Sequence, residues 1–438
     1  MIAIGISILV ILAVFFIFGA HVAVALAMTA LITGLIYIGS IWDFFAHIPW
    51  NVVSGSTLIV VPLFVLMGEL LVRSGVTDDL YAILARIMRP VPGGLLHTNI
   101  LACGLFSSIS GSSVATATTI GSAAMPVMRK YRYSERLAVG SLASGGTLGV
   151  LIPPSVILII YGLLAEVSIG ELYIAGVIPG LAMMIAFMVV ILALAFVFPK
   201  SAPKIDKDAI QKISWVKGAL NILPILILFL VVIGSIYLGI ATATESAAFG
   251  ATGALLIAAC KRKVNKNMLC EVFVNTATTT AMVLFILIGA FLLQFILSMS
   301  GIPSSLSKWV ISLGLSKTEL IILICLIYLV LGMFLESLAM LVMTIPIIVP
   351  ILQAMQIDLV WFGIIATIMV EVSLITPPVG MNLFVIQSMR NRLDQNMPQK
   401  SMMDLYIGAF PFALTMLIVL TTIIIWPSIA TGLVSYMR

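Results

Sequence analysis

GGTLGVLIPPSVILII, residues 145 to 160, has the apolar pattern of a membrane helix at both ends and of a turn in its middle. Pro153 and Pro154 remove two backbone amide donors and clash with the preceding turn, so the helix is expected to stop at LIPPS. The whole chain is 62% hydrophobic and only 9% charged, whereas an average soluble domain is about a quarter charged. A helix that breaks inside so apolar a chain needs a physical reason.

Apolar runs of about 18 or more residues recur along the 438 residues, and each is long enough to cross the ~30 Å hydrocarbon layer as a helix. Open sheets are excluded there, because unpaired backbone groups have no water to bond. The runs predict an all-α polytopic membrane protein, surrounded by lipid, with about ten transmembrane helices, two re-entrant helical hairpins and broken helices.

Nineteen of the 22 Lys and Arg residues fall in five clusters, and each cluster caps an apolar run. The clusters lie at 73–89, 129–136, 200–217, 261–266 and 390–400. The positive-inside rule predicts that all five are cytoplasmic. The alternative is a set of patches for nucleic acid or lipid head groups, but every cluster already has a topological explanation. No nucleic-acid partner is expected.

The chain repeats itself at a spacing of 224 residues. The repeated pairs are Pro126 and Pro350, Pro153 and Pro377, Pro154 and Pro378, and Ser113 and Ser337. We therefore predict two related halves, 1–200 and 216–438, joined by a polar cytoplasmic linker at 201–215. The positions of the basic clusters predict that the halves are inverted in the membrane.

Each half is expected to contain one re-entrant hairpin followed by one broken helix. Residues 95–128 start and end among basic residues, yet are too short for two crossings of about 20 residues each. Inverted repeats with interrupted helices at matching positions are typical of secondary transporters that bind substrate near the midplane. The predicted elements are a hairpin at 95–128 with its tip at SSISGSS (107–113), a broken helix at 134–166, a hairpin at 317–354 with its tip near FLESLA (334–339), and a broken helix at 358–389.

The breaks at LIPPS (151–155) and ITPPV (375–379) are expected to free backbone carbonyls. Together with Ser and Thr hydroxyls, such carbonyls are the ligands that a hard cation such as Na⁺ prefers. The half-helix after each break presents amide groups and a positive dipole end, which suit a carboxylate. The first tip is rich in hydroxyls, namely Ser108, Ser110, Ser112, Ser113 and Thr116. In the alternative interpretation, the small residues only pack helices.

Four acidic residues lie within apolar segments, where a charge costs at least about 2.5 kcal/mol. Glu336 at the second tip and Glu371 before ITPP are candidates to balance a cation or carry a proton. For Glu69 and Glu245, nearer predicted helix ends, structural hydrogen bonding is favoured. No Walker A, GxSxG or HExxH sequence occurs, so ATP hydrolysis and enzymatic catalysis are not expected.

SSISGSSVATATTIGSAAMPVM (107–128), GGTLGVLIPPS (145–155), GMFLES and LITPPVGMNLFV together resemble the large membrane subunit of tripartite ATP-independent periplasmic (TRAP) transporters over essentially the full chain. The resemblance implies a Na⁺-driven importer of an organic acid, such as a C4-dicarboxylate or sialic acid, in the bacterial inner membrane. It also implies two separate partners, a small four-helix membrane subunit and a periplasmic substrate-binding protein. A transport domain would move like an elevator on a scaffold.

Carried over by position, the resemblance implies two Na⁺ sites and a substrate site. The first Na⁺ site would involve Ser110, Gly111, Ser112, Ser113, Gly146 and Ile152. The second would involve Glu336, Ser337 and Thr376. The substrate would contact Ser113, Thr116, Ser155, Thr376 and Asn382. One departure is Ile152, which stands where the second half has Thr376, so ligation at the first break would rest more on backbone oxygen.

Two other functions stay open at this point. A stand-alone Na⁺- or H⁺-coupled carboxylate transporter of the same superfamily would need no binding protein. A channel would need a continuous pore, whose expected mark is a filter loop or a ring of charges, and neither pattern is seen in the sequence.

Overall fold

The computed structural model describes residues 2–203, 215–393 and 401–436. These residues contain twenty α-helices, two short 3-10 helices and no strand, which confirms the all-helical prediction for this part of the chain. The predicted linker at 201–215 lies mostly outside the described residues.

The helices of the predicted first half are α1 (Ile2–Ile17), α2 (Val22–Tyr37), α3 (Trp42–Ser54), η1 (Ser56–Ile59), α4 (Val60–Arg73), α5 (Val76–Met88), α6 (Gly94–Ser110), α7 (Ser113–Lys130), α8 (Glu135–Leu151), α9 (Val156–Ala165), α10 (Ile169–Val197) and η2 (Pro199–Ser201). Those of the predicted second half are α11 (Trp215–Tyr237), α12 (Ala243–Cys260), α13 (Lys266–Met299), α14 (Ile302–Ser312), α15 (Lys317–Gly332), α16 (Ser337–Ala354), α17 (Leu359–Ile375), α18 (Met381–Leu393), α19 (Met403–Ile425) and α20 (Ser428–Ser435).

Several of these helices are long and apolar enough to cross a membrane. Among the described residues there are six such spans, or seven if the bent pair α8 and α9 counts as one. Four further apolar helices are shorter than 18 residues, including α2 and α17. The chain is therefore a multi-pass membrane protein, and about ten crossings stays a prediction.

Each predicted hairpin corresponds to two antiparallel helices. In the first, Asn99 Nδ2 on α6 donates to Met128 Sδ near the far end of α7, at 3.2 Å. In the second, Lys317 Nζ at the start of α15 donates to the carbonyl of Gln356 just beyond α16, at 2.9 Å. Both contacts lie far from the turn between the two helices, so each chain segment folds back along itself.

The helices are interrupted at both tandem prolines. Between α8 and α9 the axis bends by 40°. Between α17 and α18 the chain is non-helical from Thr376 to Gly380. The Pro153–Pro154 and Pro377–Pro378 peptide bonds are both cis. The helical backbone is thus interrupted at two places related by the sequence repeat.

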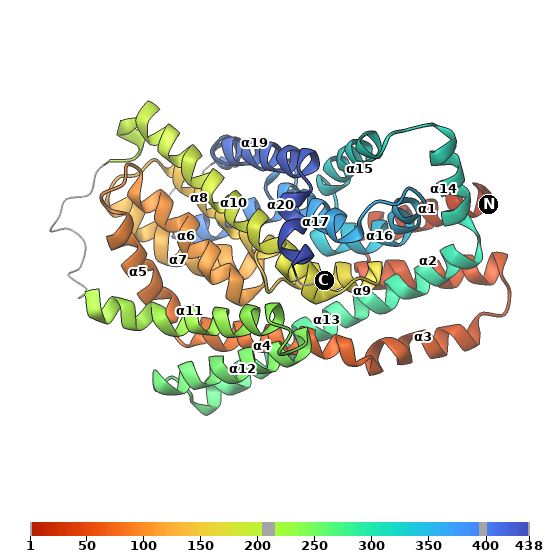
Figure 1. The fold of residues 1–438 in the computed structure, drawn as a ribbon, viewed down its shortest axis with the longest axis horizontal. Coiled ribbons are helices and arrows are strands. Elements are labelled where there is room, and N and C mark those ends of the chain that lie inside the picture. The colour runs from red at the N-terminus through yellow and green to blue at the C-terminus, as the bar shows by residue number, and fades with distance from the viewer. Residues whose placement is uncertain (1, 204–214, 394–400, 437–438) are drawn as a thin grey trace.

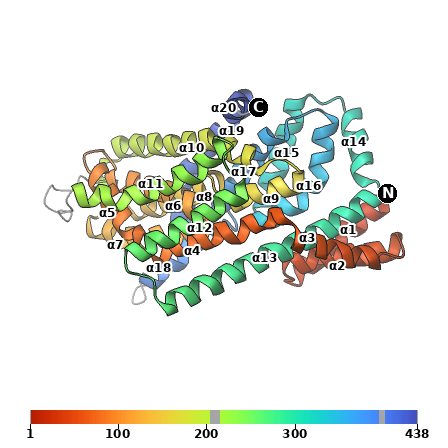
Figure 2. The ribbon, with the colours of Figure 1, turned by 60° about the horizontal axis from the view of Figure 1, so that its bottom comes forward.

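The helices pack into two groups, which Figures 1 and 2 show on different sides of the molecule. The first, here called the scaffold group, consists of α2, α4, α12 and α13. Within it, α13 packs against α2 and α4, and α4 packs against α12. The second, here called the hairpin group, consists of α6–α10 and α15–α19. Within it, α8 packs against α6, α7 and α19, and α17 packs against α15 and α19. The two hairpins and the two broken helices therefore form one packed unit.

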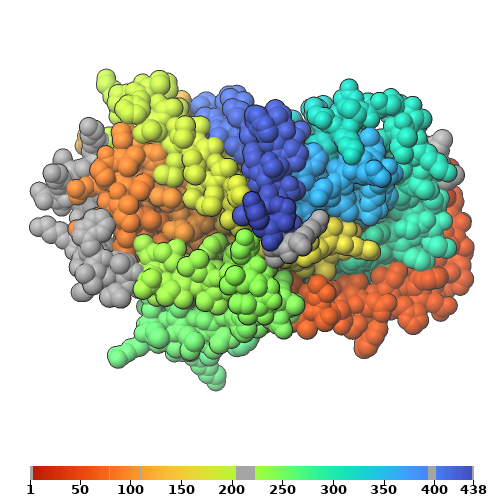
Figure 3. Space-filling view, in the orientation of Figure 1, coloured from red at the N-terminus to blue at the C-terminus, as the bar shows by residue number. Residues whose placement is uncertain are grey.

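Helix α19 packs against α8, the first part of the first broken helix, and is followed in the chain by α20. It lies with α20 across the middle of one face of the molecule, between α10 and the second hairpin (Figure 3). Where α19 crosses α8, Gly140 and Gly408 meet so closely that a Cβ on Gly140 would overlap the carbonyl oxygen of Gly408. Small residues allow such close crossings of membrane helices.

We expect the substitution Gly140→Ala to destabilise the protein by about 2 kcal/mol, because an inserted methyl group would force two backbones apart. The matched control is Gly234→Ala on α11, where a Cβ would meet nothing within 4 Å. That change should be neutral or slightly stabilising, since alanine favours helix more than glycine does. Thermal unfolding in detergent measures both, and equal midpoints for the two variants would contradict the prediction.

Candidate functional site

The turn between α6 and α7 is shaped by its own hydroxyl groups. Gly111 ends α6 with a left-handed φ of 59°, and Ser112 caps α7 by accepting the Ala115 amide at 3.3 Å. The hydroxyls of Ser110 and Thr116 lie 2.9 Å apart and share a hydrogen bond. Ser110, Ser112 and Ser113 are half-buried, while Thr116 is fully buried. The tip therefore presents hydroxyl and carbonyl oxygens that can accept further contacts, and it contains no charged side chain.

The first break is buried, and the Ser155 hydroxyl forms hydrogen bonds with the backbone on both sides of it. Ser155 caps α9 by accepting the Leu158 amide at 3.4 Å, and its hydroxyl donates to the carbonyl of Val150 at the end of α8. One carbonyl expected to be free is therefore occupied. Ser155 is fully buried, so direct contact with a substrate would require an exchange of these bonds.

The first tip lies directly on the first break. A Cβ on Gly111 would be 3.1 Å from the carbonyl oxygen of Pro154. Further along α8, a Cβ on Gly149 would be 3.4 Å from the carbonyl oxygen of Ser112. The absence of side chains at these two glycines lets the backbone of the tip lie against the backbone of α8 and of the first break.

Asn382, on the second broken helix, reaches the same place. A Cβ on Gly146 would be 3.2 Å from Asn382 Nδ2 and 3.3 Å from the carbonyl oxygen of Ser113. Asn382 is fully buried and donates from Nδ2 to the carbonyl of Ala143 at 3.1 Å, while its Oδ1 has no hydrogen-bond partner within the described residues. The structure thus brings together three predicted site residues from both halves: Ser113, Gly146 and Asn382.

The second tip is arranged differently. Glu336 caps α16, and its carboxylate accepts the amides of Leu338 and Ala339 at 3.1 and 3.2 Å. Ser337 is buried, and in the described part of the chain its hydroxyl has no partner. A carboxylate that caps its own helix is fixed in place, and it still has lone pairs for a cation.

Thr376, the predicted partner of Glu336 and Ser337, bonds within its own helix. Its hydroxyl donates to the carbonyl of Val372 at 2.6 Å. The second tip does meet α17 one turn earlier, where a Cβ on Gly332 would overlap the side chain of Ser373. The hydrogen bonds of Glu336 and Thr376 therefore do not connect the two residues, although their helices pack together.

The remaining intramembrane acids separate into two kinds. Glu245 forms a capping box with Thr242, and Glu69 accepts Asn275 Nδ2 at 3.1 Å, so both make the structural hydrogen bonds that the sequence favoured. Glu371 is fully buried in α17, and within the described residues neither carboxylate oxygen has a hydrogen-bond partner. Its role as a proton or cation carrier stays a prediction.

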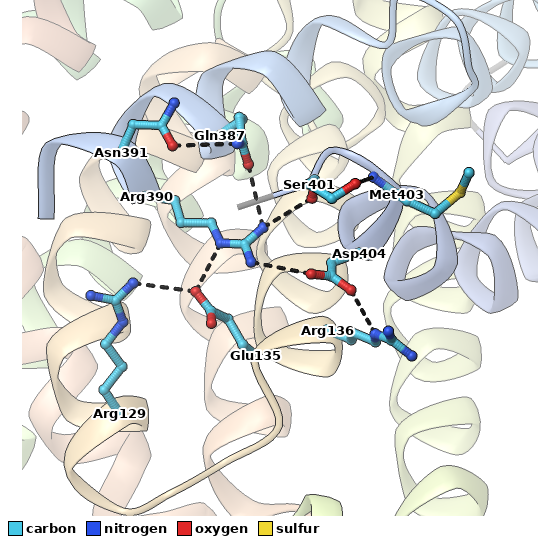
Figure 4. A network of polar contacts seen from close by, with 9 residues as sticks. All are labelled: Arg129, Glu135, Arg136, Gln387, Arg390, Asn391, Ser401, Met403 and Asp404. Carbon is cyan, nitrogen blue, oxygen red and sulfur yellow. Dashed lines mark hydrogen bonds and ion pairs between the residues drawn. The ribbon is translucent and has the colours of Figure 1, made fainter. Parts of the chain in front are cut away.

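Arg390 was predicted only as part of a cytoplasmic basic cluster, and the sequence did not indicate that its side chain is buried. Arg390 is only 1% exposed and heads the fully buried side chains by volume in the described part of the chain. Its guanidinium lies among Glu135, Asp404 and the carbonyl of Ser401 (Figure 4). The only available signal was its position, eight residues after Asn382 on a helix with a polar face.

Two cavities lie away from the tips, at the C-terminal end of α9. One, of about 860 Å³, is lined by the ends of α9, α10 and α12. The other, of about 590 Å³, is lined by residues of α13, α14 and α16, and both cavities include Glu166. The second cavity thus marks a boundary between the scaffold group and the hairpin group.

Two interrupted membrane helices, each packed against a helical hairpin and joined to one another through Asn382, are typical of a membrane transport protein. Residues 9–429 match the family described as the tripartite ATP-independent periplasmic transporter, DctM component. The chain is 33% identical to the C4-dicarboxylate TRAP transporter large permease protein DctM of Pseudomonas aeruginosa, over 87% of each chain. It is 31% identical to the sialic acid TRAP transporter large permease protein SiaM of Vibrio cholerae, over 86% of this chain and 85% of that one.

The chain belongs to the TRAP transporter family as its large permease subunit. Its fold is also similar to that of the Alcanivorax borkumensis YdaH transporter, with a TM-score of 0.68 at 14% identity over 91% of this chain and 90% of that one. The predicted family is confirmed. The resemblance to YdaH concerns the fold alone.

We expect Gly146→Val to abolish uptake of the transported substrate, because its Cβ would already lie 2.9 Å from Ala117 Cβ and 3.2 Å from Asn382 Nδ2. Gly234→Val on α11 is the control, since that position has free space. Uptake into membrane vesicles with matched amounts of protein measures the difference. A Gly146→Val protein that transports at the normal rate would show that the close approach is not needed.

Proposed function

We propose that this chain is the permease subunit of a secondary transporter that imports an organic acid across the bacterial inner membrane on a Na⁺ gradient. The observation that carries the proposal is the meeting of Ser113, Gly146 and Asn382 beside the first tip and the first break. Hydroxyl, amide and carbonyl oxygens are the ligands that a hard cation takes from a protein. Two relatives named for carboxylate transport support the substrate class.

In the proposed mechanism, Na⁺ and the substrate are carried together. Asn382 Oδ1 has no partner in the described residues, and both the Asn382 side chain and the Ser113 carbonyl approach Gly146, so this position suits the first cation. The substrate carboxylate would then be held by the bound cation, by hydroxyl groups and by the amide end of a half-helix. Coupling follows because the anion binds well only after the cation has supplied positive charge.

The movement that we propose is a displacement of the hairpin group along the scaffold group. Both hairpins and both broken helices pack within one unit. The cavity of about 590 Å³ lies at its boundary with α13 and α14. An elevator-type movement would carry the enclosed site across the membrane without opening a continuous pore.

Two protein partners complete the proposal, a small four-helix membrane subunit and a periplasmic substrate-binding protein. Proteoliposomes that contain this chain and the small subunit should accumulate the organic acid only with an inward Na⁺ gradient and with the binding protein present. Uptake that needs neither condition would overturn the proposal. Uptake that needs a cation gradient but no binding protein would show a stand-alone carrier instead.

The role of the first tip can be tested by removing single side-chain oxygens, since substitution does not remove the Ser113 carbonyl that approaches Gly146. Ser113→Ala and Asn382→Ala should each raise the Na⁺ concentration for half-maximal uptake about tenfold, which corresponds to about 1.4 kcal/mol of lost binding. Ser122→Ala is the matched control, because Ser122 is exposed on the same helix α7 and its hydroxyl donates to the carbonyl of Thr119. An unchanged Na⁺ dependence in the first two variants would remove the proposed cation from this position.

A further inference from the structure

Arg390 makes hydrogen bonds to residues of three different segments. Its Nε donates to Glu135 Oε1, at the start of α8, at 2.8 Å. Its Nη2 lies 3.4 Å from Asp404 Oδ2, at the start of α19. Its Nη1 donates to the carbonyl of Ser401 and to Gln387 Oε1, both at 3.4 Å. Figure 4 shows the guanidinium enclosed by these groups.

The two carboxylates are themselves held by further arginines. Arg129 Nη2 donates to Glu135 Oε1 at 3.2 Å, and Arg136 Nε donates to Asp404 Oδ1 at 2.7 Å. Buried charges are costly unless they are paired and hydrogen-bonded on all sides. Because Arg390 is almost completely buried, its charge is tolerated only while the ends of α8, α18 and α19 stay together.

The spacing of hydrogen-bonding residues along α8 and α18 shows that this network fixes the position of α18 along α8. Asn382 and Arg390 are eight residues apart on α18, and their partners Ala143 and Glu135 are eight residues apart on α8. Both intervals correspond to about 12 Å of helix. The two helices therefore run antiparallel with two equally spaced connections. A slip by one residue, about 1.5 Å, would break both at once.

We propose that Arg390 is a positioning residue of the transport site: by pairing with Glu135 it sets the axial register of α18 on α8 and so holds Asn382 against Gly146 and Ser113. This role rests on the proposed function of Asn382 in binding the transported cation. Arg390 lies about 12 Å along α18 from Asn382. No motif of the sequence connects this arginine with transport.

A cross-linking experiment tests the axial position of α18 without any transport, measured against α7, which packs on both α8 and α18. Gly121 on α7 faces Met389, the neighbour of Arg390, since a Cβ on Gly121 would lie 2.9 Å from the Met389 sulfur. In a chain whose four native cysteines are replaced by alanine, the pair Gly121→Cys and Met389→Cys should react with a short bifunctional thiol reagent. Arg390→Met should lower this cross-linking about fivefold or more, and Arg390→Lys, which keeps the charge but loses the fork geometry, by less.

Arg392→Met is the matched control, because Arg392 is an exposed arginine on the same helix. It should leave cross-linking unchanged. Glu135→Gln provides a second test that keeps Arg390 in place, and it should lower cross-linking in the same direction as Arg390→Met. Unchanged cross-linking in Arg390→Lys, Arg390→Met and Glu135→Gln would overturn the proposal.

Uptake measurements then connect the register to the site. If Arg390 acts through Asn382, Arg390→Met should raise the Na⁺ requirement of the otherwise normal protein about tenfold, but that of an Asn382→Ala protein less than about threefold. Independent, multiplying effects would contradict the positioning role. If the unmodified protein shows no Na⁺-dependent uptake, the proposed function fails, while the cross-linking result still decides whether Arg390 sets the register.

Discussion

A peptide group in the hydrocarbon layer has to find its hydrogen-bond partner within the protein, because no water is available to it. This constraint governs the two places where the helices are interrupted. At the first, Ser155 serves both sides of the gap, since its hydroxyl donates to the last turn of α8 and accepts from the first turn of α9. Gly111 and Gly149 then bring the turn of the first hairpin close enough to exclude solvent. The first interrupted helix is stable here because the hairpin covers it.

The same constraint explains why the two broken helices belong together. Asn382 from α18 uses its amide on the carbonyl of Ala143 in α8, and Arg390 carries its buried charge to the beginning of that helix. Neither group can be withdrawn without leaving an unpaired polar atom inside the protein, which is costly. Movement of one broken helix therefore has to carry the other with it. This favours the proposed displacement of the whole hairpin group over the opening of a single helix.

Much of this arrangement could be predicted from the sequence, for reasons that can be stated. Tandem prolines act through local sterics, so the interruptions after Leu151 and Ile375 follow from the residues themselves. The turn at Gly111 and Ser112 likewise follows from a glycine between serines. What joins the elements could not be predicted, because Asn382 bonds to a backbone carbonyl, and every residue has one.

The burial of Arg390 could not be predicted for a different reason. Counting positive charges treats an arginine near the end of an apolar run as a residue at the membrane surface. Helix α18 instead continues to Leu393, and two carboxylates from α8 and α19 enclose the guanidinium. Those carboxylates are 255 residues before and 14 residues after Arg390 in the chain. Only the folded structure shows that the three charges share one place.

The two breaks are related in sequence but not in exposure, and the difference bears on how the site is reached. The first break is buried, and Ile152 packs against α10 so closely that a Cβ on Gly180 would lie 2.7 Å from it. At the second break Pro377 and Pro378 are exposed, and Val379 is 40% exposed. Opening the first break would require separating α10 from the unit that it helps to hold together. The proposed transport mechanism is therefore more easily achieved if the first break stays closed and the hairpin group changes its position against α13, since that movement leaves the buried hydrogen bonds of both breaks intact.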